Sequence, residues 1–108
     1  MNLPTEIFGD VIVVHTPDEL GAEQAQAIEQ FLTTLERQKV VVDLDNTELL
    51  DSGGLTALLD SQDNLRELSG DLRLATTNPV NRKILEVTRL DRQMDVFESV
   101  IDAVKSFS

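Results

Sequence analysis

The chain has 108 residues, the size of one ordinary domain, and no cysteine, which excludes disulfides, zinc–thiolate sites and thiol catalysis. Its formal net charge of −11 would repel nucleic acid and anionic membrane surfaces, but would attract a protein that carries a basic patch. Residues 1–15 lack the features of a signal peptide, and no apolar run approaches the roughly 20 residues that span a bilayer. We therefore expect one cytoplasmic domain, residues 1–108, without membrane insertion.

Two extended segments open the chain. Residues 6–8 and 11–15 are rich in strand-forming side chains, and the turn pair Gly9-Asp10 joins them. We expect them to form two successive strands.

A first helix is predicted after these segments. Thr16 offers an N-cap, with Pro17 at the first helical position and Glu19 closing a capping box. Because Gly21 disfavours a helix, the regular part is expected to begin near Ala22. Its apolar positions recur at helical spacing: Ala25, Ile28, Phe31, Leu32 and Leu35.

The middle of the chain predicts a buried strand and a long helix. Residues 39–45 form a nearly continuous apolar run, typical of a central strand buried on both faces. Residues 51–69 predict the second helix, and Gly70 is a natural stop after it. The inner stripe of this helix is expected to contain Leu55, Leu58, Leu59, Leu65 and Leu68.

The last third alternates in the same way. Residues 71–76 predict a strand, and Asn78 followed by Pro79 is typical of a helix start. Residues 94–97 predict a short strand, and Ser99 is the expected cap of a last helix. The expected inward positions of these two helices are Val80, Ile84, Leu85 and Val87, then Val100, Ile101, Val104 and Phe107.

The predicted order is β-β-α-β-α-β-α-β-α. Alternating strands and helices imply an α/β fold with a mixed, mostly parallel sheet of about four to five strands. About four helices should pack against this sheet, with right-handed crossovers.

The segment from Asp51 to Leu55 lies where the buried strand has ended and the second helix begins. Asp51 and Ser52 both carry a short side-chain oxygen that can cap a helix. If Asp51 is the cap, Leu50 and Leu55 occupy the two positions of a hydrophobic staple. This pattern favours Asp51 and leaves the Ser52 hydroxyl free in the first turn.

Gly53 and Gly54 follow, although each glycine inside a helix costs about 1 kcal/mol relative to alanine. We expect them to leave the backbone bare, so that another molecule can approach and Ser52 stays accessible. A tight strand-to-helix turn that needs glycine would account for the same pair. Because partner sites gather at the carboxyl ends of strands in open α/β sheets, we favour the binding role.

Residues 40–44 and 51–55, separated by six residues, together resemble the STAS domain of bacterial anti-sigma factor antagonists. The motif Asp-Ser-small-Gly-Leu at this place is fairly specific. The resemblance extends over nearly the whole chain, through the two opening segments, the Asn78-Pro79-Val80 helix start and residues 96–99. It implies a STAS-like fold without catalytic activity.

The resemblance also implies a mechanism. An anti-sigma serine kinase would phosphorylate Ser52, the serine after the aspartate, and a PP2C-type phosphatase would reset it. The unphosphorylated protein would bind the kinase and free its sigma factor, whereas the phosphorylated protein would dissociate from the kinase. The implied partner-binding residues are Asp51, Ser52, Gly53 and Gly54, with Asp18 in place of a carboxylate that relatives carry after the second strand. Gly53 replaces a serine common in relatives, which removes a second phosphoacceptor.

An enzyme, a cofactor and a metal site are not expected. His15 is the only histidine and stands on the other side of the pattern from Ser52, with no nucleophile elbow and no phosphate-binding loop. Carboxylates at Asp43, Asp45 and Asp51 would permit Mg²⁺ binding, but carboxylates near strand ends are common.

Two other binding roles stay open. In a receiver domain, Asp43 or Asp45 would accept phosphate, but Glu6 and Asp10 do not form the required carboxylate cluster and Lys105 lies in the last helix. The alternative within the STAS resemblance is a non-switching binding or scaffold module in a stress-sensing or lipid-transport complex.

Overall fold

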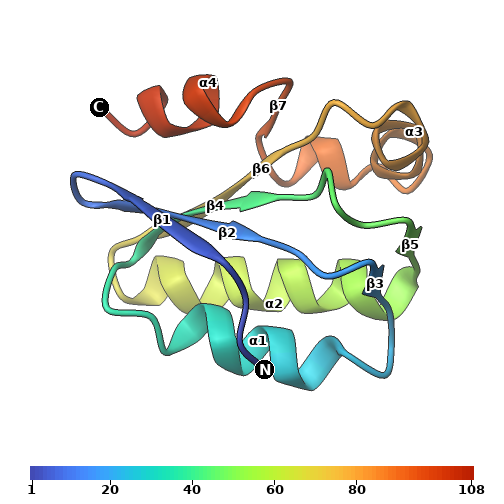
Figure 1. Ribbon diagram of the computed structural model, residues 1–108, viewed down its shortest axis with the longest axis horizontal. Coiled ribbons are helices and arrows are strands. Elements are labelled where there is room, and N and C mark those ends of the chain that lie inside the picture. The colour runs from blue at the N-terminus through green and yellow to red at the C-terminus, as the bar shows by residue number, and fades with distance from the viewer.

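A five-stranded sheet forms the middle layer of the computed structural model, which describes all residues from Met1 to Ser108 (Figure 1). The strands lie in the order β1-β2-β4-β6-β7. Only the β1–β2 pair is antiparallel, so the expected mixed, mostly parallel sheet is confirmed. The bounds are β1 (Thr5–Phe8), β2 (Val11–His15), β4 (Lys39–Asp43), β6 (Asp71–Ala75) and β7 (Val96–Phe97).

Helices cover both faces of this sheet. In Figure 1, α1 and α2 lie below it and α4 lies above it, with α3 at the end where β5 stands. No helix is both long and apolar enough to cross a membrane. The helices are α1 (Ala25–Thr33), α2 (Ser52–Glu67), α3 (Pro79–Val87) and α4 (Val100–Lys105), with a 3₁₀ turn, η1 (Leu90–Arg92), after α3.

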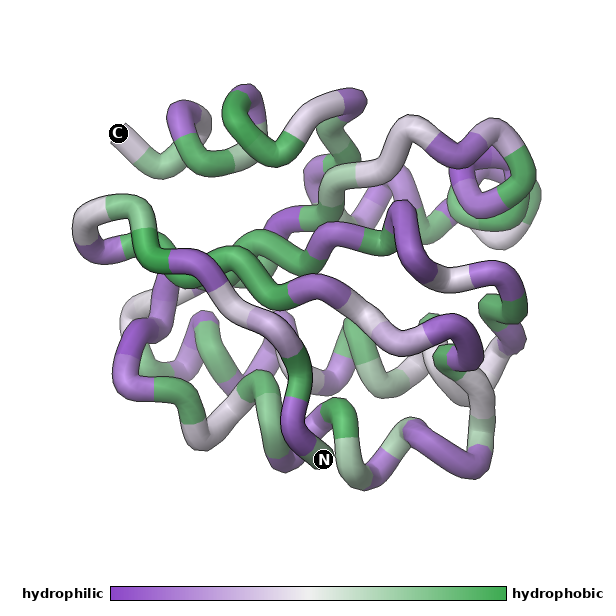
Figure 2. The backbone as a smooth tube through the Cα atoms, viewed as in Figure 1, coloured by the Kyte–Doolittle hydropathy of each residue, from purple (hydrophilic) through white to green (hydrophobic).

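Strand β4 is the central strand, buried on both faces as expected. Its successive side chains point to opposite faces, because the side-chain period of a strand is two. Val40 and Val42 belong to the larger core with Leu58 of α2, whereas Val41 belongs to the smaller core with Ala103 of α4. Figure 2 shows this apolar run as continuous green along the centre of the sheet.

The structure contains a second, two-stranded sheet that the sequence did not predict. It pairs β3 (Glu19–Leu20) with β5 (Leu49–Leu50) in parallel, and we call this pair the β3–β5 ribbon. The predicted helix start at Thr16 and Pro17 is therefore wrong. The buried Thr16 hydroxyl donates to the Asp43 carbonyl (3.0 Å) and contacts the Thr47 hydroxyl (2.5 Å). Because this contact holds the chain extended, α1 begins only at Ala25 instead of near Ala22.

The caps of the last two helices are confirmed. Asn78 Oδ1 accepts from the Val80 and Asn81 amides, and Ser99 Oγ accepts from the Asp102 amide. Asn81 takes the buried position next to Val80, since its Nδ2 donates to the carbonyls of Leu44 and Thr47. Four side chains predicted to face inward are instead exposed, each in the first or last turn of a helix or just past its end: Leu68, Val80, Val87 and Ile101.

Ser69 and Gly70 together end α2, whereas the sequence indicated Gly70 alone as the stop. The helix ends at Glu67, and Ser69 rather than Gly70 adopts the left-handed conformation (φ +66°). Gly70 is required for a different reason. A Cβ atom there would lie 2.0 Å from the Gln38 carbonyl oxygen, so only glycine permits this close approach.

His15 ends β2 between two carboxylates from neighbouring strands. Its Nδ1 lies 2.9 Å from Asp43 Oδ2 of β4, and its Nε2 lies 2.6 Å from Glu6 Oε1 of β1. Only the imidazolium form donates from both nitrogens. Burial lowers the pKa of His15, but the hydrogen bonds to Glu6 and Asp43 raise it by more, so the pKa lies above its usual 6.5. His15 is thus the last residue of β2, and its two hydrogen-bond partners come from other strands of the sheet.

The free energy of unfolding should therefore fall as the pH rises. Because the pKa of His15 is higher in the folded than in the unfolded state, its contribution is fully present below about pH 6.5 and is lost as the pH passes the folded-state pKa. Urea unfolding between about pH 6 and pH 9 measures this effect. His15→Gln is the control, and an equal pH dependence in both proteins would contradict the prediction.

Candidate functional site

Asp51 caps α2, as predicted. Its backbone is extended (φ −112°, ψ −179°), and its Oδ1 accepts from the amides of Gly53 (2.8 Å) and Gly54 (3.2 Å). Leu50 and Leu55 are both buried at the staple positions on either side of the cap. The first turn of α2 is thus fixed by local interactions that the sequence specifies.

The second carboxylate oxygen of Asp51 reaches a distant segment. Oδ2 accepts from the Ala22 amide (3.3 Å), and the Asp51 amide donates to the Leu20 carbonyl (3.3 Å). Gly21 lies between them, and a Cβ atom there would be 2.6 Å from Asp51 Oδ2. Asp51 therefore ties the start of α2 to the segment that joins β3 to α1.

Ser52 is the first residue of α2 and is exposed. Its carbonyl accepts from the Thr56 hydroxyl (2.9 Å), while its own hydroxyl makes no hydrogen bond within the chain. Because Asp51 already supplies the cap, the Ser52 side chain has no structural task. It is a free hydroxyl at the positive end of a 16-residue helix.

The expectation that Gly54 leaves bare backbone for a second molecule is wrong, and at Gly53 the space that a side chain would occupy is filled as well. A Cβ atom at Gly53 would lie 2.5 Å from Ala22 Cα, and one at Gly54 would lie 2.0 Å from the Leu20 carbonyl oxygen. Gly54 is buried and Gly53 half-buried. The chain's own residues 20–22 fill the space, so the glycines permit a tight packing contact within the molecule.

Asp18 and Ser52 lie at opposite ends of the β3–β5 ribbon. Its side chain is exposed, and its carbonyl accepts from the amides of Glu48 (2.8 Å) and Leu49 (3.0 Å). This register places Asp18 level with Glu48, ahead of β5, whereas Ser52 follows β5. The structure therefore does not bring Asp18 against Ser52.

Two other carboxylates, those of Glu19 and Glu23, lie beside Asp51, and the sequence did not indicate them as partner contacts. Glu19 and Glu23 line a hollow that also contains Asp51, with Leu49 and Ala22 as its apolar part. The signal in the sequence was weak, because a strand of two residues such as Glu19–Leu20 gives only one step of alternation.

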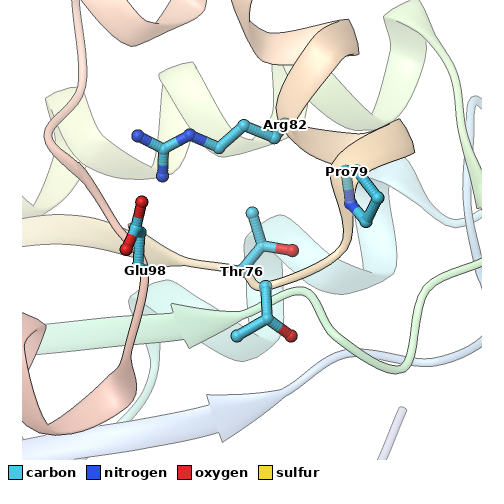
Figure 3. Close-up of a pocket in the computed structure, with 5 residues that line it drawn as sticks. Thr76, Pro79, Arg82 and Glu98 are labelled. Carbon is cyan, nitrogen blue, oxygen red and sulfur yellow. The ribbon is translucent and has the colours of Figure 1, made fainter.

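A second hollow opens at the carboxyl ends of β6 and β7, lined by Thr76, Thr77, Pro79, Arg82 and Glu98 (Figure 3). Both threonine hydroxyls donate to Asp45, at 3.0 and 3.1 Å. None of the predicted site residues lines this hollow. Asp45 is bound to these threonines and Asp43 to His15, so both phosphoacceptors of the receiver interpretation are engaged in the fold.

Gly54→Ala should lower the free energy of unfolding by more than about 2 kcal/mol, because the new methyl group would meet a backbone carbonyl that cannot rotate away. Ser52→Ala, two residues earlier, should change it by less than about 0.5 kcal/mol, because the hydroxyl is exposed and unbonded. Urea unfolding of the two variants tests both statements. Equal stability of Gly54→Ala and wild type would refute the packing role.

Comparisons with known proteins agree with this architecture. The sequence model of the STAS domain matches residues 2–103. A Thermotoga neapolitana homolog of TM1081, named as an anti-sigma factor antagonist, is 23% identical over 107 residues, which cover 94% of each chain. The crystal structure of an anti-sigma factor antagonist from Mycobacterium paratuberculosis superposes with a TM-score of 0.84 at 25% identity, covering 97% of this chain and 92% of that one.

A further solved structure has the same fold at lower identity. Bacillus SpoIIAA in its phosphorylated form superposes with a TM-score of 0.70 at 17% identity, covering 99% of this chain and 100% of that one. Since the STAS model matches nearly the whole sequence and the strands and helices follow the same fold, this chain belongs to the STAS domain family.

Proposed function

We propose that this chain is an anti-sigma factor antagonist in which Ser52 is a phosphorylation switch. The unphosphorylated form binds an anti-sigma serine kinase, the phosphorylated form is released, and a PP2C-type phosphatase restores the first form. The observation that carries the proposal is the exposed, unbonded Ser52 hydroxyl beside a cap that Asp51 already supplies. The names of similar proteins and the phosphorylated SpoIIAA structure support it.

A phosphate on Ser52 leaves the fold intact. It adds about −1.5 to −2 charges at neutral pH. The positive end of α2 favours an anion in its first turn, which offsets the proximity of Asp51. Because the Ser52 side chain is exposed and takes no part in the core, the modification changes the surface and not the interior.

Release follows from the chemistry of the kinase. To phosphorylate Ser52, the kinase must bring the γ-phosphate of ATP within reach of the hydroxyl. After transfer, the phosphoserine faces the phosphates of ADP, and like charges oppose each other. Residues 1–36 and 40–65, which include Ser52 and the first turn of α2, contain no lysine or arginine that could neutralise them.

The partner contacts assigned to this surface are Asp51, Ser52, the half-buried Gly53 and, at the other end of the ribbon, Asp18. Gly54 contributes only by packing, because it is buried. The chain acts in this scheme as a binding partner and not as an enzyme.

Phosphorylation of Ser52 should weaken binding to the kinase at least tenfold while the fold is retained. The experiment incubates the chain with each anti-sigma serine kinase encoded in the same genome and ATP, and maps an added phosphate by peptide mass analysis. Affinities of the unmodified chain, the phosphorylated chain and Ser52→Asp are then measured, with circular dichroism as a check of folding.

Ser52→Ala is the matched control, which should bind like the unmodified chain and accept no phosphate. A phosphorylated chain that binds with unchanged affinity would refute the switch. An unmodified Ser52 in cells under all growth and stress conditions would favour the non-switching scaffold module instead.

A further inference from the structure

The β3–β5 ribbon presents an exposed leucine two residues before Asp51. The register pairs Glu19 with Leu49 and Leu20 with Leu50. Leu20 and Leu50 are buried, so their neighbours Glu19 and Leu49 point to the outer face, because side chains alternate along a strand. Leu49 is 55% exposed and Glu19 is exposed as well, so this outer face is open to solvent.

Carboxylates surround this leucine without partners of opposite charge. The hollow beside it contains Glu19, Glu23 and Asp51, and Glu48 precedes it in the chain. None of these four forms an ion pair, although six ion pairs occur elsewhere in the molecule. Lysine and arginine are absent from both segments that build the ribbon, and no other part of this chain forms an ion pair with these carboxylates.

An apolar side chain at the centre of a charged rim is typical of a protein–protein interface. We propose that the outer face of the β3–β5 ribbon docks a protein surface in which lysine or arginine side chains surround an apolar hollow that receives Leu49. The inference rests on the proposed function and extends it, since it assigns the affinity to the ribbon and leaves the switch to Ser52. Nucleic acid and anionic membranes do not fit, because the same carboxylates repel them.

The ribbon and Ser52 act on different charges of the partner. The carboxylates around Leu49 face basic side chains, whose attraction is long-range and weakened by salt. Ser52 faces the phosphates of the bound nucleotide. A phosphate on Ser52 therefore opposes binding locally, even though the ribbon beside it attracts a basic surface.

Leu49→Ser separates these contributions. We expect the affinity of this variant for the kinase to fall at least tenfold, because an apolar contact is lost. Its dependence on salt should not change, because the substitution removes no charge. Leu49→Met should bind within about threefold of the unmodified chain. The double variant Glu19→Gln, Glu23→Gln should bind more weakly at low salt and show a flatter salt dependence.

Leu68→Ser is the matched control. Leu68 is 50% exposed and follows the opposite end of α2, so its replacement should leave the affinity unchanged. Urea midpoints equal to the unmodified chain show that both serine variants are folded. If the unmodified chain binds the kinase and Leu49→Ser binds equally well, the docking surface is refuted and the proposed function stands. If the unmodified chain binds no such kinase, both are refuted.

Discussion

The site depends on one contact, that of the first turn of α2 with the backbone of residues 20–22. Gly54 lies so close to the Leu20 carbonyl that any side chain would collide with it. Asp51 stabilises the same contact, because one of its carboxylate oxygens caps α2 and the other accepts from the Ala22 amide. The neighbours of Ser52 are held by packing and hydrogen bonds, whereas its own hydroxyl is exposed and makes no hydrogen bond within the chain. The exposed Ser52 thus lies on a first helical turn whose other residues are packed tightly against residues 20–22.

This contact also marks the limit of what the sequence could predict. The cap at Asp51, the helix start at Asn78 and the central strand β4 follow from local signals, a short side-chain oxygen or an apolar run, and the structure confirms them. The β3–β5 ribbon and the late start of α1 depend on Thr16 and Thr47, which are 31 residues apart. Glycine is required at position 54 because the Leu20 carbonyl, more than 30 residues away in the sequence, lies against it. Local propensity is overridden where such long-range contacts decide the backbone path.

Charge is distributed unevenly along the chain. All nine basic residues lie at 37–39 and from 66 onward, so the ribbon and the first turn of α2 are built from acidic and neutral segments. A field of one sign over one part of the surface steers a partner of the opposite sign and raises the rate of encounter. Under the proposed function, the net charge of −11 would therefore do more than aid solubility, because the segments without basic residues include Ser52.

A local charge is sufficient to operate such a switch without a change of fold. A hundredfold loss of affinity needs about 2.8 kcal/mol. Two unit charges about 6 Å apart repel by roughly 2.8 kcal/mol at an effective dielectric constant near 20, and a phosphoserine opposite a nucleotide phosphate brings more than one such pair together. The helix N-terminus favours the same anion by only about 0.3–1 kcal/mol at an exposed position. In the proposed switch, the modification would thus be tolerated in the free protein and opposed in the complex, so the difference between the two states would arise at the interface.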